Sequence, residues 1–245
     1  MIPKIIHYCW FGGNPLPEDA KRYIATWKKY CPDYEIREWN EHNFDVTQNT
    51  YCYEAYKAKK WAFVTDYVRL KVLHDCGGIY MDTDVEVCKA LDPFLRYSAF
   101  SGFETENKIP TGILGSQKEG GWITYLLSYY DTKHFNLNGK MDLTTNVSTI
   151  SQMTKDKYDI KLDNTFQIFG ENNVIFPFEY FCAKDMMDGK IKSTNNTYTV
   201  HHFAGSWLPW HRRVRHQVKI ILVKVFGVDF VNKLRKVLLK ERIIQ

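Results

Sequence analysis

The feature that most constrains the fold is a helix that runs through two glycines into a strand ending in paired carboxylates. Residues 54–75 repeat apolar side chains at three- and four-residue spacing, which predicts a helix. Gly77 and Gly78 then end it, because glycine readily takes the left-handed backbone found at helix C-termini. The apolar strand expected over 79–84 closes with Asp82-Thr83-Asp84. A helix joined this tightly to an apolar strand indicates an α/β fold.

The rest of the chain alternates between strand and helix patterns in the same way. Residues 3–10 and 34–39 have the pattern of strands, and residues 18–30 between them have helical spacing. Residues 134–165 are polar and yield no assignment. The later expected elements are short strands over 98–117, a helix over 121–131, and strands over 173–178 and 198–203. These patterns predict one α/β domain over residues 1–210 and a separate helical tail over 211–245.

The tail differs from the domain in charge. Residues 211–245 hold ten Lys or Arg against two acidic residues, in a chain whose net charge is only +5. Its apolar positions recur at helical spacing on both sides of Gly227, and basic amphipathic helices bind anionic membrane surfaces. Packing of the apolar stripe on the domain, or on a second subunit, is the alternative. Nucleic acid is not an expected partner, because no recognition motif accompanies the charge.

Cysteine use and apolar runs indicate the compartment. The six cysteines form no Cys-x-x-Cys pair, which favours reduced core thiols in a cytosolic protein. The N-terminal apolar run is too short and polar for a signal peptide, and no run of 18 apolar residues exists. We therefore expect a cytoplasmic protein that lies peripherally at the inner face of the cell membrane.

The two carboxylates of Asp82-Thr83-Asp84 have the spacing of a cation site. Residues i and i+2 of a strand share a face, so both side chains are expected to converge on one divalent ion. An ion held by few carboxylates keeps positions open for substrate phosphates. A calcium EF-hand is excluded, because Val87 and Pro93 stand where that loop needs Gly and Glu. No phosphate-binding Gly-x-x-x-x-Gly-Lys loop is present. Two solvated acids at a strand end remain the plainer alternative.

Other polar and aromatic residues are candidates on the same grounds. Asp66 and Arg69 lie three apart and share a helix face, which is expected to be exposed and to border the ligand. A surface ion pair is the alternative. Trp10, at the end of the first strand, belongs either to the core or to a stacking surface for a base. One histidine of the pair at 201–202 completes the metal site, unless both lack a role.

Four blocks of the chain together resemble a known family. They are residues 2–13 (Ile-Pro-Lys-Ile-Ile-His-Tyr-Cys-Trp-Phe-Gly-Gly), 63–69, 77–84 and 201–207. The chain resembles the family 32 glycosyltransferases, whose sugar-binding region contains a DXD motif, and more distantly the clostridial glucosylating toxins. The resemblance implies a GT-A fold, a Rossmann-like mixed sheet flanked by helices. It also implies a nucleotide-sugar donor, Mn²⁺ or Mg²⁺, and retention at the anomeric carbon.

The resemblance also implies a role for each matching residue. Asp66, Arg69, Asp82 and Asp84 are the implied catalytic residues. The implied contacts are Cys9 and Trp10 to the base, Asp66 and Arg69 to the donor sugar, Tyr80 to the ribose or phosphates, Asp82 to the ribose, sugar and metal-bound water, Asp84 and His201 to the metal, and Ser206 and Trp207 to the diphosphate. No matching acceptor residue is found between 104 and 195. No nucleophilic carboxylate stands out, so no covalent intermediate is expected.

These observations predict a metal-dependent retaining glycosyltransferase. It would move a hexose from a UDP-sugar to a lipid-linked oligosaccharide in bacterial capsule or other surface polysaccharide synthesis. A GDP-mannose-dependent mannosyltransferase is an alternative. A non-catalytic partner protein that keeps the nucleotide-sugar fold is another, although intact Asp66, Arg69, Asp82 and Asp84 argue against it.

Overall fold

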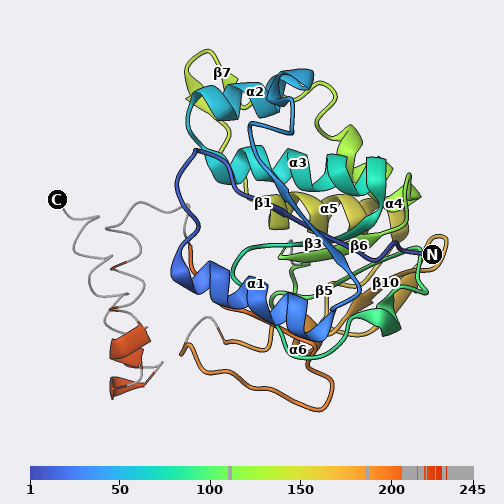
Figure 1. Ribbon diagram of the computed structural model, residues 1–245, viewed down its shortest axis with the longest axis vertical. Coiled ribbons are helices and arrows are strands. Elements are labelled where there is room, and N and C mark those ends of the chain that lie inside the picture. Colours follow the sequence, from blue (N-terminus) through green and yellow to red (C-terminus); the bar gives the residue numbers. More distant parts are fainter. Residues whose placement is uncertain are drawn as a thin grey trace.

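The computed structural model describes residues 1–109, 112–185 and 188–205, and beyond these only residues 214, 218, 220–223, 225–227 and 230. A seven-stranded mixed sheet lies at the centre, in the order β2-β1-β3-β6-β5-β10-β9 (Figure 1). The strands are β1 (Ile5–Cys9), β2 (Glu35–Trp39), β3 (Gly78–Met81), β5 (Ala99–Gly102), β6 (Ile113–Ser116), β9 (Gln167–Phe169) and β10 (Asn173–Phe176). Two small ladders join β4 (Val85–Val87) to β11 (Thr199–His201), and β7 (Asn136–Leu137) to β8 (Lys140–Met141).

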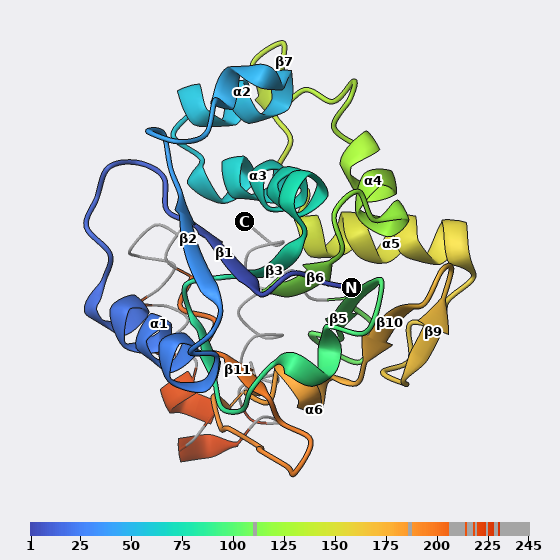
Figure 2. The same ribbon diagram turned by 45° about the vertical axis from the view of Figure 1, so that its right-hand side comes forward.

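Helices cover both faces of the sheet, as Figure 2 shows. The helices are α1 (Glu18–Tyr30), α2 (Thr50–Lys57), α3 (Trp61–Cys76), α4 (Gly121–Ser128), α5 (Asn146–Tyr158) and α6 (Phe178–Phe181), with 3-10 turns at Val46–Gln48 and Asp92–Phe94. Helices α3, α4 and α5 lie over one face, and α1 and α6 lie over the other. Fully buried aromatic residues fill each layer, Trp122 on the first side and Trp27 on the second.

The directions of the strands bring several strand ends to one edge. Strands β1, β2 and β3 are parallel, and β6 runs antiparallel to both β3 and β5. Strand β10 is parallel to β5. The carboxyl ends of β1, β3, β5 and β10 therefore meet at the same edge of the sheet, which is where open α/β sheets bind ligands.

Two expected elements have different boundaries in the structure. The single helix predicted over 54–75 is wrong, because α2 ends at Lys57 and α3 begins at Trp61. Lys59 between them has a positive φ of 56°, a backbone turn that a continuous helix does not allow. Helix α2 also starts earlier than predicted, at Thr50, because the side chain of Asn49 accepts a hydrogen bond from the Cys52 N–H.

The strand that carries the carboxylates is shorter than predicted. It ends at Met81, and residues 82–84 form a turn that leads into β4. The Val85 N–H closes this turn by donating to the Asp82 carbonyl oxygen at 3.0 Å. The prediction that both carboxylates share one face of a strand is therefore wrong, and a turn positions them instead.

The segment over 134–165, which the sequence left unassigned, contains the β7–β8 hairpin and helix α5. The predicted tail over 211–245 lies almost entirely outside the described residues. In the part of the chain that the structure describes, no helix is both long and apolar enough to cross a bilayer.

His7 is a fully buried polar residue that joins three parts of the fold. Its Nε2–H donates to the carbonyl oxygen of Gly77 at 2.8 Å, and its Nδ1 accepts from the Trp39 indole N–H at 3.0 Å. Both ring nitrogens are thus satisfied only in the neutral form, since a proton on Nδ1 would face the indole N–H. Burial, the main cause, lowers the pKa of His7 to about 4.

This predicts an acid-sensitive contribution to stability. In the unfolded chain the pKa of a histidine is about 6.5. Between about pH 6.5 and pH 4, His7 is therefore protonated in the unfolded state but neutral in the folded state. The free energy of unfolding falls as the pH falls through that window. At about 1.4 kcal/mol per pKa unit, the full effect is roughly 3 kcal/mol. Urea unfolding at pH 7 and pH 4.5 should show a smaller loss of unfolding free energy for His7→Gln than for the wild type. His42→Gln, at an exposed position, should behave as the wild type; equal losses in all three would contradict the assignment.

Candidate functional site

Three side chains, two from the turn after β3 and one from β11, meet beyond the end of β3. Asp82, Asp84 and His201 each offer a ligand atom, and these atoms all lie within 4.8 Å of one another. The antiparallel ladder between β4 and β11 sets His201 opposite Val85, directly after Asp84. His201 Nε2 lies 3.2 Å from Asp84 Oδ1. Two carboxylates and an imidazole are a donor set that fits Mg²⁺ or Mn²⁺.

The electrostatics of this cluster are strongly coupled. Burial raises the pKa of Asp84, but the His201 imidazolium outweighs that effect and holds the carboxyl pKa below its usual range. Burial lowers the pKa of His201, and the Asp84 carboxylate more than reverses this and raises it well above the usual value. Each group thus stabilises the charge of the other, as a cation held beside both carboxylates would stabilise theirs.

The structure distinguishes the two neighbouring histidines. His202 points away from the cluster, where its Nε2 lies 2.8 Å from Glu86 Oε2 and its ring stacks on Tyr23 with centroids 4.4 Å apart. His201, the histidine preferred from the sequence, is therefore the one that lies beside the carboxylates.

The residues after β11 fold back over Asp84. The Ala204 backbone N–H donates to Asp84 Oδ2 at 2.7 Å, and the His202 N–H donates to the Asp84 carbonyl oxygen at 2.9 Å. Phe203 takes a positive φ of 54° to make this reversal, and its ring lies 4.2 Å from that of His201. The predicted diphosphate contacts, Ser206 and Trp207, lie outside the described residues.

Arg69 connects helix α3 to the carboxylate turn. Its Nη2 lies 3.3 Å from Asp66 Oδ1 and 3.4 Å from Asp82 Oδ1, and its guanidinium lies 4.7 Å from the centre of the Tyr80 ring. Tyr80 donates its hydroxyl hydrogen to Asp82 Oδ1 at 2.8 Å. The guanidinium and the phenol thus hold the first carboxylate from two sides.

The prediction that Asp66 and Arg69 form an exposed helix face is wrong. Both are buried, with 7% and 5% of their surfaces exposed, because α3 packs this face against the sheet edge. Burial raises the pKa of Asp66 to about 6, against the opposing effect of Arg69. Burial alone would lower the pKa of Arg69, but the carboxylate of Asp82 chiefly reverses this and raises it. The pair is nevertheless where the sequence put it, next to the carboxylate turn.

The predicted base contacts lie at the end of β1. Cys9 is buried, and burial raises the pKa of its thiol. Trp10 is half-buried and donates its indole N–H to the Asn14 carbonyl oxygen at 2.6 Å. Beside this loop is a shallow hollow of about 490 Å³, and Glu41 on its wall accepts from the Gly12 N–H at 2.7 Å. The hollow lies at the β1–β2 end of the sheet and includes none of the cation-binding candidates.

Sequence reasoning missed Asn146. It begins helix α5, is 6% exposed, and its Nδ2 donates to Asp66 Oδ1 at 3.2 Å. Its Oδ1 is buried and has no hydrogen-bond partner among the described residues. A buried acceptor without a donor is costly, so this oxygen is available to a hydroxyl of a ligand. Helical spacing in the unassigned segment is weak, and an asparagine alone carries no signal.

Residues 17–101 match the family model described as "Glycosyltransferase sugar-binding region containing DXD motif", so the resemblance seen in the sequence is confirmed. A solved structure described as "PaToxG Glycosyltransferase" matches with a TM-score of 0.50 and 20% identity, over 64% of this chain and 69% of that one. The GT-A fold expected from the resemblance is likewise confirmed.

Two fungal proteins each match about half of this chain. The chain is 32% identical over 125 residues to "Inositol phosphoceramide mannosyltransferase 3" of Schizosaccharomyces pombe. This match covers 48% of this chain and 34% of that protein. Over 120 residues it is 26% identical to "Mannosyl phosphorylinositol ceramide synthase CSH1" of Saccharomyces cerevisiae, 47% of this chain and 32% of that protein. The chain thus spans about a third of the length of these relatives.

Gly112 provides a test of the cation site. A Cβ atom at this position would lie 2.8 Å from His201 Nδ1, closer than packed atoms allow. Gly112→Ala should displace the imidazole and weaken Mn²⁺ binding by roughly tenfold, the loss that follows when ligand positioning is disturbed. Isothermal titration with Mn²⁺ measures this.

Gly121→Ala is the matched control, because a Cβ there meets nothing within 4 Å. This variant should bind Mn²⁺ as the wild type does. Equal affinity in the folded Gly112→Ala protein would remove His201 from the site.

Proposed function

We propose that the chain is a metal-dependent glycosyltransferase that moves a hexose from a nucleotide sugar to a glycan acceptor. The observation that carries the proposal is the cluster of Asp82, Asp84 and His201 at the carboxyl edge of a GT-A sheet. The family match over residues 17–101 supports the same reaction class.

Asp82, Asp84 and His201 would hold the ion, which when bound would supply Lewis-acid neutralisation of the charge on the departing diphosphate. Arg69 adds a fixed positive charge, because a guanidinium stays protonated throughout the physiological pH range. Its two carboxylate partners prevent it from swinging away, so its charge is already oriented before the substrate arrives.

The donor sugar would lie against Asp66, Arg69 and Asn146. Asp66 can accept hydrogen bonds from sugar hydroxyls, and the unpartnered Asn146 Oδ1 adds another acceptor directly beside it. Trp10 and the hollow beside Gly12 would receive the base. Retention at the anomeric carbon, which the resemblance implies, completes the proposal; product NMR of the new glycosidic bond tests it.

UDP-hexose is the donor proposed from the resemblance. GDP-mannose is a second candidate, and one observation favours it: the relatives reported above carry names of mannosyl transfer. The same site can take either, because both donors present a diphosphate to the cation and a hexose to Asp66.

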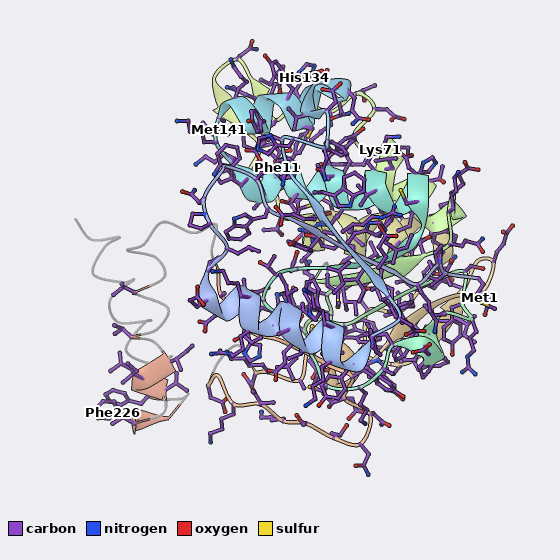
Figure 3. The ribbon with its side chains drawn as sticks, viewed as in Figure 1. Met1, Phe11, Lys71, His134, Met141 and Phe226 are labelled. Carbon is purple, nitrogen blue, oxygen red and sulfur yellow. The ribbon has the colours of Figure 1, made fainter. Side chains whose placement is uncertain are left out.

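A lipid-linked oligosaccharide is the proposed acceptor, in bacterial surface polysaccharide synthesis. The basic tail would hold the enzyme at an anionic inner-membrane surface. Of the described residues beyond 205, the large apolar ones that are about half exposed or more are Val214, Val218, Ile221, Val225, Phe226 and Phe230. Figure 3 draws Phe226 on a helical segment apart from the sheet. Apolar and basic side chains on one amphipathic segment are the combination that binds anionic bilayers.

The donor is tested by thermal denaturation with UDP- and GDP-sugars, each with and without Mn²⁺. A ligand present at 100 times its Kd stabilises by about 2.7 kcal/mol, which raises the Tm by roughly 5–10 °C for a chain of this size. We expect such a shift with one nucleotide only, and only with Mn²⁺. In Asp84→Ala the Mn²⁺-dependent part of the Tm shift should be lost. In Asn146→Ala the nucleotide sugar should raise the Tm no more than the nucleoside diphosphate does, and the shift with the nucleoside diphosphate should be that of the wild type.

The absence of any shift for the folded wild type, with all donors and Mn²⁺, would contradict the proposal. The non-catalytic alternative would then be preferred.

Membrane association is tested by sedimentation with vesicles of phosphatidylglycerol and phosphatidylcholine. Removal of residues 211–245 should abolish co-sedimentation, and 0.5 M NaCl should weaken it in the wild type, because salt screens the lysine and arginine charges. Equal sedimentation of the full and shortened proteins would rule out the tail as the membrane contact.

A further inference from the structure

Glu104 is a carboxylate near the cation cluster that neither the sequence motifs nor the proposed reaction uses. It follows β5, which lies two strands from β3 with β6 between them. The last pair between β3 and β6 is Met81 with Ile113. One residue further on, the Asp82 N–H donates to the Gly112 carbonyl oxygen at 2.9 Å.

The register of the strands, extended past their last pairs, places Glu104 one residue beyond the level of Asp82. The pairs Ala99–Ser116 and Phe100–Gly115, continued along the antiparallel ladder, set Phe103 opposite Gly112. Glu104 therefore stands one residue beyond the row that contains Asp82. Two strand spacings, roughly 10 Å, separate the backbones of Glu104 and Asp82.

The surroundings of Glu104 connect it to the cation cluster. Phe103, directly after β5, is fully buried in the core beneath α3, α4 and α5, and Glu104 follows it at the start of the turn. Its carboxylate interacts electrostatically with His201 and with Cys182. Burial chiefly raises the pKa of Glu104, with Asp82 and Asp84 acting in the same direction.

The turn that carries Glu104 is firmly held. The Glu104 N–H donates to the Lys108 carbonyl oxygen at 2.7 Å, which closes a loop over 104–108. The Ile109 N–H then donates to Ser151 Oγ at 3.0 Å, which ties the turn to α5, the helix that begins at Asn146. The Glu104 carboxylate is thus presented from a braced turn and is half-buried, while Glu106 in the same turn is exposed.

The order of the strands separates the two substrates. The base contacts lie at the end of β1, on one side of β3, and Glu104 lies at the end of β5, on the other side. A nucleotide bound from β1 to the cation cluster leaves the β5 side for the second reactant. We propose that Glu104 is an acceptor-binding residue, whose carboxylate accepts a hydrogen bond from the acceptor sugar hydroxyl that attacks. This inference rests on the proposed glycosyl transfer.

The test compares Glu104→Gln with Glu106→Gln. The substrate is the nucleotide sugar that binds in the donor screen, with Mn²⁺, and the acceptor probes are water and the methyl glycosides of glucose, galactose and mannose. Release of the nucleoside diphosphate is measured against acceptor concentration. The neutral amide of Glu104→Gln accepts a weaker hydrogen bond than the carboxylate, which should lower kcat/KM for the best glycoside by roughly tenfold. The KM for the donor and the Kd for Mn²⁺ should stay within twofold, and Glu106→Gln should match the wild type.

Two outcomes would overturn the assignment. Unchanged kcat/KM for the glycoside in Glu104→Gln would remove the residue from the acceptor site. Weakened Mn²⁺ or donor binding in that variant would make Glu104 part of the cation or donor site instead. A wild type that binds no nucleotide sugar, or binds one and releases no diphosphate with any probe, contradicts the proposed glycosyl transfer itself, which keeps the two failures distinguishable.

Discussion

A buried arginine between two carboxylates is the interaction on which the rest of the site depends. Arg69 lies within 3.4 Å of both Asp66 and Asp82, and almost none of its surface is exposed. Removal of one partner from a buried ion pair costs about 3–5 kcal/mol, because the remaining charge is left uncompensated. Helix α3 and the carboxylate turn are therefore held in one relative position, and Asp82 faces the cluster whether or not a ligand is present.

Strand order then decides which residues can act together. The residues proposed to contact the base, the carboxylate turn and Glu104 come from the ends of β1, β3 and β5. These ends lie at one edge because β6 runs in the opposite direction between β3 and β5. The fourth component, His201, arrives from the far end of the domain through the β4–β11 ladder. The close approach of Gly112 to its ring shows how little space this arrangement leaves.

Local patterns predicted much of this and missed what depends on distant contacts. Helix α1 and strand β2 fall where spacing and alternation put them. The break at Lys59 was missed, because apolar spacing continues across it while the backbone does not. The apolar strand was expected to continue through Asp84, but the Val85 N–H closes a turn after Met81 instead. Asn146 was missed because its partner, Asp66, is 80 residues away.

The sequence by itself determined the α/β class, the carboxylate pair, the Asp66–Arg69 pair and the family resemblance. Each of these is written in residues close together along the chain, where spacing has direct geometric meaning. Only the tertiary structure decided that Arg69 is buried, that His201 rather than His202 lies beside Asp84, and that Asn146 lies beside Asp66. These features depend on strand register and helix packing between distant segments, and no local pattern encodes which side chains such packing brings together.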